Sequence, residues 1–108
     1  MADTAEAESA PEDSVNFAIT DGVRARAAAD RGELEAADRH SERAVGYAFR
    51  MDTPKPQADA LCVRAYVLRA GGRRGEAAEA VDRAIAIYER KGELAAANRA
   101  RSLFAADA

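Results

Sequence analysis

Four residues with chemically active side chains follow one another at helical spacing in the middle of the chain: Asp59, Cys62, Tyr66 and Arg69. Their separations of three, four and three residues place them on one face of a helix. The face combines a carboxylate, a thiol, a phenol and a guanidinium. Tyrosine supplies buried area in an interface and arginine supplies directional hydrogen bonds, especially to carboxylates. This face is therefore a candidate binding surface.

The other reactive residues form no pattern of an enzyme or a metal site. Cys62 is the single cysteine and His40 the single histidine, which is too few for a zinc or redox site. His40 and Ser41 point about 100° apart on a helix, and no loop that could stabilise an oxyanion accompanies them. Gly71-Gly72 lacks the Lys-Ser or Lys-Thr of a phosphate-binding loop. We expect no enzymatic activity, no catalytic residue, no cofactor and no metal, and interpret Cys62 as a small buried residue and His40 as solvent-facing.

The distribution of charge restricts the classes of partner. Residues 1–13 carry five acids and no base, which predicts an acidic disordered tail. From Ser14 onward, 16 bases and 14 acids leave a net charge of +2, which disfavours nucleic acid as a partner. The first residues resemble no secretory signal, and no run of about 18 apolar residues could cross a membrane. We expect a cytoplasmic protein that binds a protein or peptide and no membrane.

Glycine and proline divide the remaining chain into helices, and no segment alternates in the manner of a strand. Asp13 or Ser14 can cap the first helix, and Gly32 can end it. Pro54 and Pro56 separate the second helix from the third. The expected ranges are 14–30, 33–51, 54–70, 75–91 and 93–106. The fold class is therefore all-α, with about five helices.

The helices repeat with a period of 40 residues. A shift of 40 aligns nine identical residues among the 39 from Ser14 to Asp52, including the turn glycines Gly32 and Gly72. Within one repeat, small and apolar residues form facing stripes at helical spacing. The stripes comprise Leu61, Ala65 and Leu68 against Ala77, Val81, Ala84, Ile85 and Tyr88, and Asp21, Ala25 and Ala28 against Ala37, Ser41, Ala44, Val45 and Ala48. The repeat unit is thus predicted to be a helical hairpin.

This pattern resembles the tetratricopeptide repeat: a small residue at Ala65, a turn at Gly72, alanines at Ala77 and Ala84, and an aromatic at Tyr88. The stretch from Ala58 to Gly92 looks like the carboxy-terminal repeats of bacterial adenylate-cyclase-like signalling ATPases and transcriptional activators. The resemblance implies antiparallel hairpins stacked as a short right-handed solenoid over residues 14–108, with repeats at 14–53 and 54–92 and a capping helix at 93–106. The chain departs from the family at Asp21, where a large residue is usual, and in its period.

The resemblance also implies a function, a non-catalytic scaffold that binds a partner segment in a concave groove. The groove would be lined by the face that carries Asp59 and its repeat equivalents, and the predicted partner-binding residues are Arg26, Asp59, Tyr66, Arg69 and Arg99. Three arginines suit an acidic peptide. An equally weighted interpretation is that these arginines only pair with Asp59 and neighbouring acids. The alternative function is a regulatory module of a larger signalling ATPase, cyclase or transcription factor, and an RNA- or DNA-binding repeat ranks third. The oligomeric state stays open.

Overall fold

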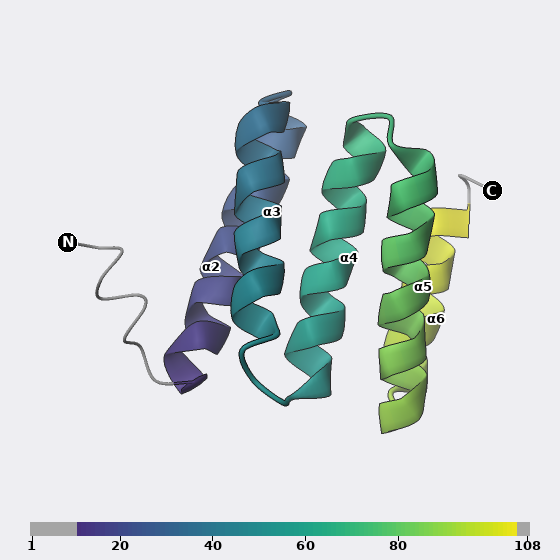
Figure 1. Cartoon of the computed structure of the whole chain (residues 1–108). Helices are drawn as coiled ribbons and strands as arrows, with labels where there is room; N and C mark the ends of the chain where they lie inside the picture. The colour runs from purple at the N-terminus through teal and green to yellow at the C-terminus, as the bar shows by residue number, and fades with distance from the viewer. Residues whose placement is uncertain (1–10, 106–108) are drawn as a thin grey trace.

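A computed structural model of the chain describes residues 11–105, which form five helices and no strand (Figure 1). The all-α prediction is confirmed for this part of the chain. The helices, labelled as in Figure 1, are α2 (Pro11–Asp30), α3 (Leu34–Ala48), α4 (Pro54–Ala70), α5 (Arg74–Lys91) and α6 (Leu94–Ala105).

Two helix boundaries differ clearly from those expected. Helix α2 begins at Pro11, before the predicted caps Asp13 and Ser14, so the last residues of the predicted tail are helical. Proline is well suited to a first helical position because its missing N–H has no partner there. Helix α3 ends at Ala48, three residues earlier than predicted. Residues 1–10 of the predicted tail lie outside the described residues.

Three turns share one glycine-based geometry. Gly32, Gly72 and Gly92 all adopt positive φ values near 80°, which residues with a Cβ rarely adopt. In each turn the next backbone N–H bonds back to a carbonyl five residues earlier, as in the Schellman motif. The Glu33, Arg73 and Glu93 amides donate to the carbonyls of Ala28, Leu68 and Tyr88 at 2.9, 2.8 and 2.8 Å. These turns reverse the chain after α2, α4 and α5.

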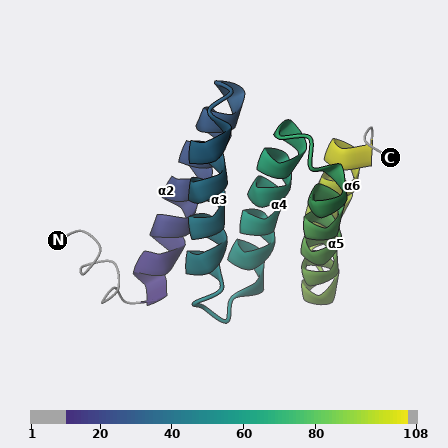
Figure 2. The ribbon, with the colours of Figure 1, turned by 45° about the horizontal axis from the view of Figure 1, so that its top comes forward.

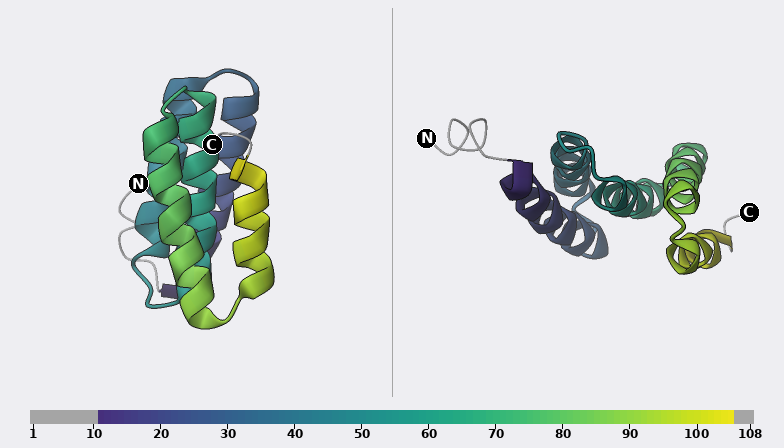
Figure 3. Two further views of the ribbon diagram at one scale, coloured as in Figure 1. Left: turned by 90° about the vertical axis from the view of Figure 1, so that its right-hand side faces the viewer. Right: turned by 90° about the horizontal axis from the view of Figure 1, so that it is seen from below.

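Helix α4 lies in the middle of the molecule. In the view of Figure 1, α3, α4 and α5 stand side by side, with α2 behind α3 and α6 behind α5. Figure 2 shows the same order from a tilted direction, and the view from below in Figure 3 places α4 between the pair α2 and α3 and the pair α5 and α6. Helix α4 thus faces α2 and α6 on one side, here called the inner face, and α3 and α5 on the other, the outer face.

Alanines make the helix contacts close. Ala37, Ala44, Ala65 and Ala84 have no exposed surface, so the backbones approach each other at these points. Larger side chains fill the remaining space, and Tyr88, Leu61 and Ile87 join the buried alanines of α6 in one cluster. The predicted facing stripes are therefore confirmed, because their members are buried apart from the half-buried Val45 and Ile85.

Asp21 shows how the chain accommodates an acid within one of the predicted packing stripes. Its carboxylate is buried in α2, and His40 Nδ1 lies 3.1 Å from Oδ1 while Arg43 Nε donates to Oδ2 at 3.4 Å. Buried carboxylates are tolerated when they are paired in this way. The prediction of a solvent-facing His40 is wrong, because its ring is half-buried against Asp21.

Candidate functional site

The inner face carries a pocket in which four of the five predicted partner-binding residues meet. Arg26 from α2 and Asp59, Tyr66 and Arg69 from α4 line a pocket of about 280 Å³. The other side of the pocket is formed by Leu103 and Phe104, at the end of α6. The structure therefore brings together four side chains that the helical spacing and the 40-residue repeat predicted to lie on one face.

A second, more apolar pocket of about 420 Å³ continues along α2 and α4. Arg26, Asp59 and Val63 line both pockets, so the two form one depression, which we call the inner groove. Ile19 and Val23 lie one helical turn apart on its wall and are 60% and 65% exposed. Exposed apolar side chains that gather in a groove mark a contact site more often than isolated ones do.

Gly22 deepens the inner groove between α2 and α4. A Cβ at this position would meet Val63 Cγ2 at 3.6 Å, which is an ordinary van der Waals distance. Gly22 lies inside a helix and has no positive φ, so neither steric crowding nor backbone geometry requires a glycine there. Its absent side chain leaves space in the pocket.

Arginine and aromatic side chains form a continuous stack across the inner face. The guanidinium carbon of Arg26 lies 4.7 Å from the centre of the Tyr66 ring, and that of Arg69 lies 5.8 Å from it. Arg69 also lies 4.7 Å from the ring centre of Phe104 and donates from a terminal nitrogen to the Leu103 carbonyl at 2.9 Å. Cation–π contacts at such distances are weakly attractive in water. The stack thereby links α2, α4 and α6.

The Tyr66 hydroxyl adds a polar link from α4 to the end of α2. It donates a hydrogen bond to Asp30 Oδ1. This bond is the main cause, and burial the second cause, of the rise in the pKa of Tyr66 above its ordinary value. The phenol therefore stays a neutral donor at physiological pH. The hydroxyl is tied to α2, and its ring remains one wall of the groove.

Asp59 is engaged within the domain. Its carboxylate accepts hydrogen bonds from Lys55 Nζ at 3.0 Å and from the Tyr88 hydroxyl. Burial and the bond to Asp59 raise the pKa of Tyr88 strongly. Cys62 Sγ lies 3.9 Å from the same hydroxyl, and burial raises the pKa of its thiol, so a reactive thiolate is disfavoured. Asp59 thus joins α4 to α5 within the lining of the groove.

Arg26 and Arg99 differ from the other cations of this face. Among residues 11–105, neither makes an ion pair or a hydrogen bond, although Arg26 stacks on Tyr66. Arg26 lines both pockets of the groove, whereas Arg99 is exposed on α6 and lies outside the lining of both. The groove therefore presents one guanidinium, that of Arg26, whose hydrogen-bond donors have no acceptor in the described part of the chain.

Several contributors to this site were not identified from the sequence. Asp30 is 36 residues from Tyr66, and no local pattern relates the two. Tyr88 was assigned to the core, where its ring lies, but its hydroxyl also reaches Asp59. Ile19 is the equivalent of Asp59 under the 40-residue shift and was therefore expected on this face, whereas Val23, four residues further along the same helix, was not.

The comparisons with known proteins give no match, and the described residues contain neither a metal site nor a membrane-spanning helix. No protein-family model, curated protein or solved structure matches this chain. Within residues 11–105, no group of three or more His, Cys, Asp or Glu side chains could hold a metal ion. No helix in the described range has the length and apolarity needed to span a bilayer.

Proposed function

We propose that the chain is a non-catalytic protein-interaction scaffold that binds a partner segment in the inner groove. The observation that carries this proposal is the convergence of Arg26, Tyr66 and exposed apolar side chains on one groove built from three helices. The alternation of α2, α4 and α6 on one face with α3 and α5 on the other supports a short tetratricopeptide-like solenoid, with α6 as its cap (Figure 3).

The chemistry of the groove favours an acidic segment with an apolar anchor. An aliphatic side chain of the partner fits the space above Gly22, between Ile19 and Val23 of α2 and Val63 of α4. A carboxylate one turn further along would meet the guanidinium of Arg26, which can bind it through two parallel hydrogen bonds. Tyr66 and the carbon chain of Arg69 would cover the contact from the α6 side.

A second candidate function, a regulatory module of a larger signalling ATPase, cyclase or transcription factor, is supported by α6. Leu94 is 61% exposed on this helix. A further helix packed on α6 would cover it, as successive repeats do in a solenoid. Both functions use recognition without chemistry, and they differ in whether the partner is a separate protein.

Selection of peptides from a random phage-displayed library tests the groove. We expect the wild-type domain to enrich peptides that combine carboxylates with a large aliphatic residue. Arg26→Ala should weaken their binding by removing the ion pair, and Gly22→Leu should weaken it by filling the pocket.

Two control variants make the same kinds of substitution outside the inner groove. Arg39→Ala removes an exposed arginine of α3, and Ala86→Leu adds a side chain on the exposed surface of α5. If the control variants abolished binding while Arg26→Ala and Gly22→Leu left it intact, the inner groove would not be the site. Enrichment of basic peptides alone would contradict the proposed partner chemistry.

A further inference from the structure

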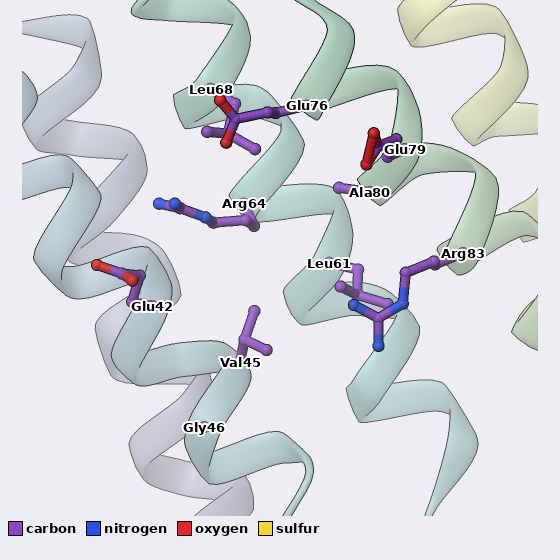
Figure 4. A pocket seen from close by; sticks show the side chains of 10 residues that line it. All are labelled: Glu42, Val45, Gly46, Leu61, Arg64, Leu68, Glu76, Glu79, Ala80 and Arg83. Carbon is purple, nitrogen blue, oxygen red and sulfur yellow. The ribbon is translucent and has the colours of Figure 1, made fainter. Parts of the chain in front are cut away.

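The outer face of α4 carries a separate groove, which the proposed function does not use. The groove has a volume of about 440 Å³ and lies between α3 and α5 over α4 (Figure 4). The apolar part of its floor consists of Leu61, Leu68, Ala80 and the half-buried Val45. Helix α4 therefore forms the floor of two grooves that open in opposite directions, and we call this one the outer groove.

Most charges around the outer groove are paired with one another. Arg64 projects from its floor and is held by Asp38, and its terminal nitrogen also donates to Ser41 Oγ at 2.8 Å. Arg73 bonds to Glu76 at 2.6 Å and lies 3.6 Å from Asp38. Two carboxylates, Asp38 and Glu76, thus offset the two guanidiniums of this cluster.

Two further carboxylates lie on opposite sides of the groove, and one of them, Glu42, interacts with Arg73 through its charge alone. Glu42 on α3 and Glu79 on α5 are exposed and form no ion pair or hydrogen bond with any residue between 11 and 105. Figure 4 shows them on either side of Arg64 and Leu61. The nearby Arg83 stacks on the Phe49 ring, 5.5 Å from its centre. The three side chains Glu42, Glu79 and Arg83 therefore give the rim a net charge of −1.

Gly46 is a second feature of the outer groove, because its missing side chain leaves part of the groove open. It lies within α3 with no positive φ, and an added Cβ would meet nothing within 4 Å. A glycine inside a helix costs stability relative to alanine, and here no turn or close approach of two backbones explains it. Its effect is to lower the α3 wall of the groove next to Val45 (Figure 4).

From these observations we infer that the outer groove is a second docking surface, which binds a basic segment of a partner protein. The aliphatic part of a lysine or arginine side chain would lie on Leu61, Leu68 and Ala80. Its cationic end would bind Glu42 or Glu79, and an apolar neighbour would enter the space beside Gly46. The two grooves have opposite charge preferences, so the domain could hold an acidic segment on one face and a basic segment on the other.

Chemical-shift mapping on the ¹⁵N-labelled domain with two synthetic peptides tests this inference. The probes are acetyl-Leu-Lys-Leu-Lys-Leu-amide and the equivalent peptide with glutamate in place of lysine. The lysine peptide should shift the amide signals of Glu42, Gly46 and Glu79, and the glutamate peptide should not. The double variant Glu42→Gln with Glu79→Gln should weaken binding of the lysine peptide by up to about fivefold for each carboxylate, as expected for exposed ion pairs.

A matched control removes the same amount of charge from the same two helices. Glu35→Gln with Asp82→Asn alters exposed acids of α3 and α5 outside the groove lining and should leave the affinity for the lysine peptide unchanged. Gly46→Leu should raise the melting temperature through its better helix propensity and still abolish binding, a combination that a purely structural role would not give. Equal losses in the control and the test variants, lysine-peptide shifts confined to the inner groove, or stronger binding of the glutamate peptide to the outer groove would each overturn the inference. The first and third of these outcomes leave the proposed function of the inner groove untouched, whereas binding of the lysine peptide to the inner groove would also count against its proposed preference for acidic segments.

Discussion

Replacing Ala84 with leucine should destabilise the domain more than any exposed substitution of the same type. Ala84 is completely buried where α5 meets α4 and α6, among Ala58, Leu61, Tyr88, Ala97 and Ala100. A leucine there has no free volume and must displace a neighbouring helix, which typically costs about 1 to 3 kcal/mol. Because a domain of this size gains only roughly 5 to 15 kcal/mol on folding, such a loss is a large fraction of its stability.

Thermal unfolding followed by circular dichroism measures this cost. About 1 kcal/mol lowers the melting temperature of a small domain by roughly 4 to 8 °C, so Ala84→Leu should lower it by roughly 4 to 24 °C. Ala86→Leu is the control, because Ala86 is exposed on the same helix and leucine is nearly as good a helix former as alanine. Equal melting temperatures for the two variants would refute the assigned facing of α5.

Three further predictions concern the groove, the alkaline limit of stability and the last helix. Gly22→Ala should stabilise the domain against urea by about 0.5 to 1 kcal/mol, because alanine is the better helix former and its Cβ fits 3.6 Å from Val63; a loss of stability would show that the close approach of α2 and α4 requires glycine. Because the pKa of Tyr88 is raised in the folded state, its neutral hydroxyl stabilises the fold below the unfolded-state pKa of about 10, and this contribution should be lost as the pH rises above that value. Tyr88→Phe should therefore flatten the decrease in stability against urea above about pH 10. An identical dependence of stability on pH in the two proteins would contradict the role of the Tyr88 hydroxyl. Truncation after Gly92 should uncover Tyr88 and Ile87 and produce aggregation or loss of cooperative unfolding, whereas a stable monomer by size-exclusion chromatography would show that α6 is not a cap.

The helices could be predicted from the sequence because local chemistry determines them. Glycines with positive φ end three of the helices, and prolines begin α4 after the break at Asp52 and Thr53. The alanine stripes also predicted which faces are buried, since a residue at the wrong position of a helix would place a large side chain between two backbones. The early end of α3 was missed because Phe49, Arg50 and Met51 are ordinary helix residues, and nothing in their types marks the end.

The site was predictable only as far as helical spacing extends. Spacing places Asp59, Tyr66 and Arg69 on one face of α4, and the 40-residue offset adds Arg26 from α2. The same offset gives Arg99 a position along α6 but does not determine how that helix lies relative to the groove, and Arg99 lines neither pocket. Contacts between distant residues, such as the Tyr66 to Asp30 hydrogen bond and the pairing of Asp21 with His40, depend on how the helices pack and left no local pattern.

Chemical-shift mapping of an acidic peptide selected by the domain is the most direct measurement of which groove binds the partner. The account predicts that the peptide shifts the amide signals of Gly22, Val23, Arg26 and Tyr66, on the inner face, and that Arg26→Ala reduces its affinity by about fivefold. Arg39→Ala should leave the affinity unchanged. Shifts confined to Gly46, Glu79 and Arg83, on the outer face, with full affinity retained by Arg26→Ala, would contradict the assignment of the inner groove.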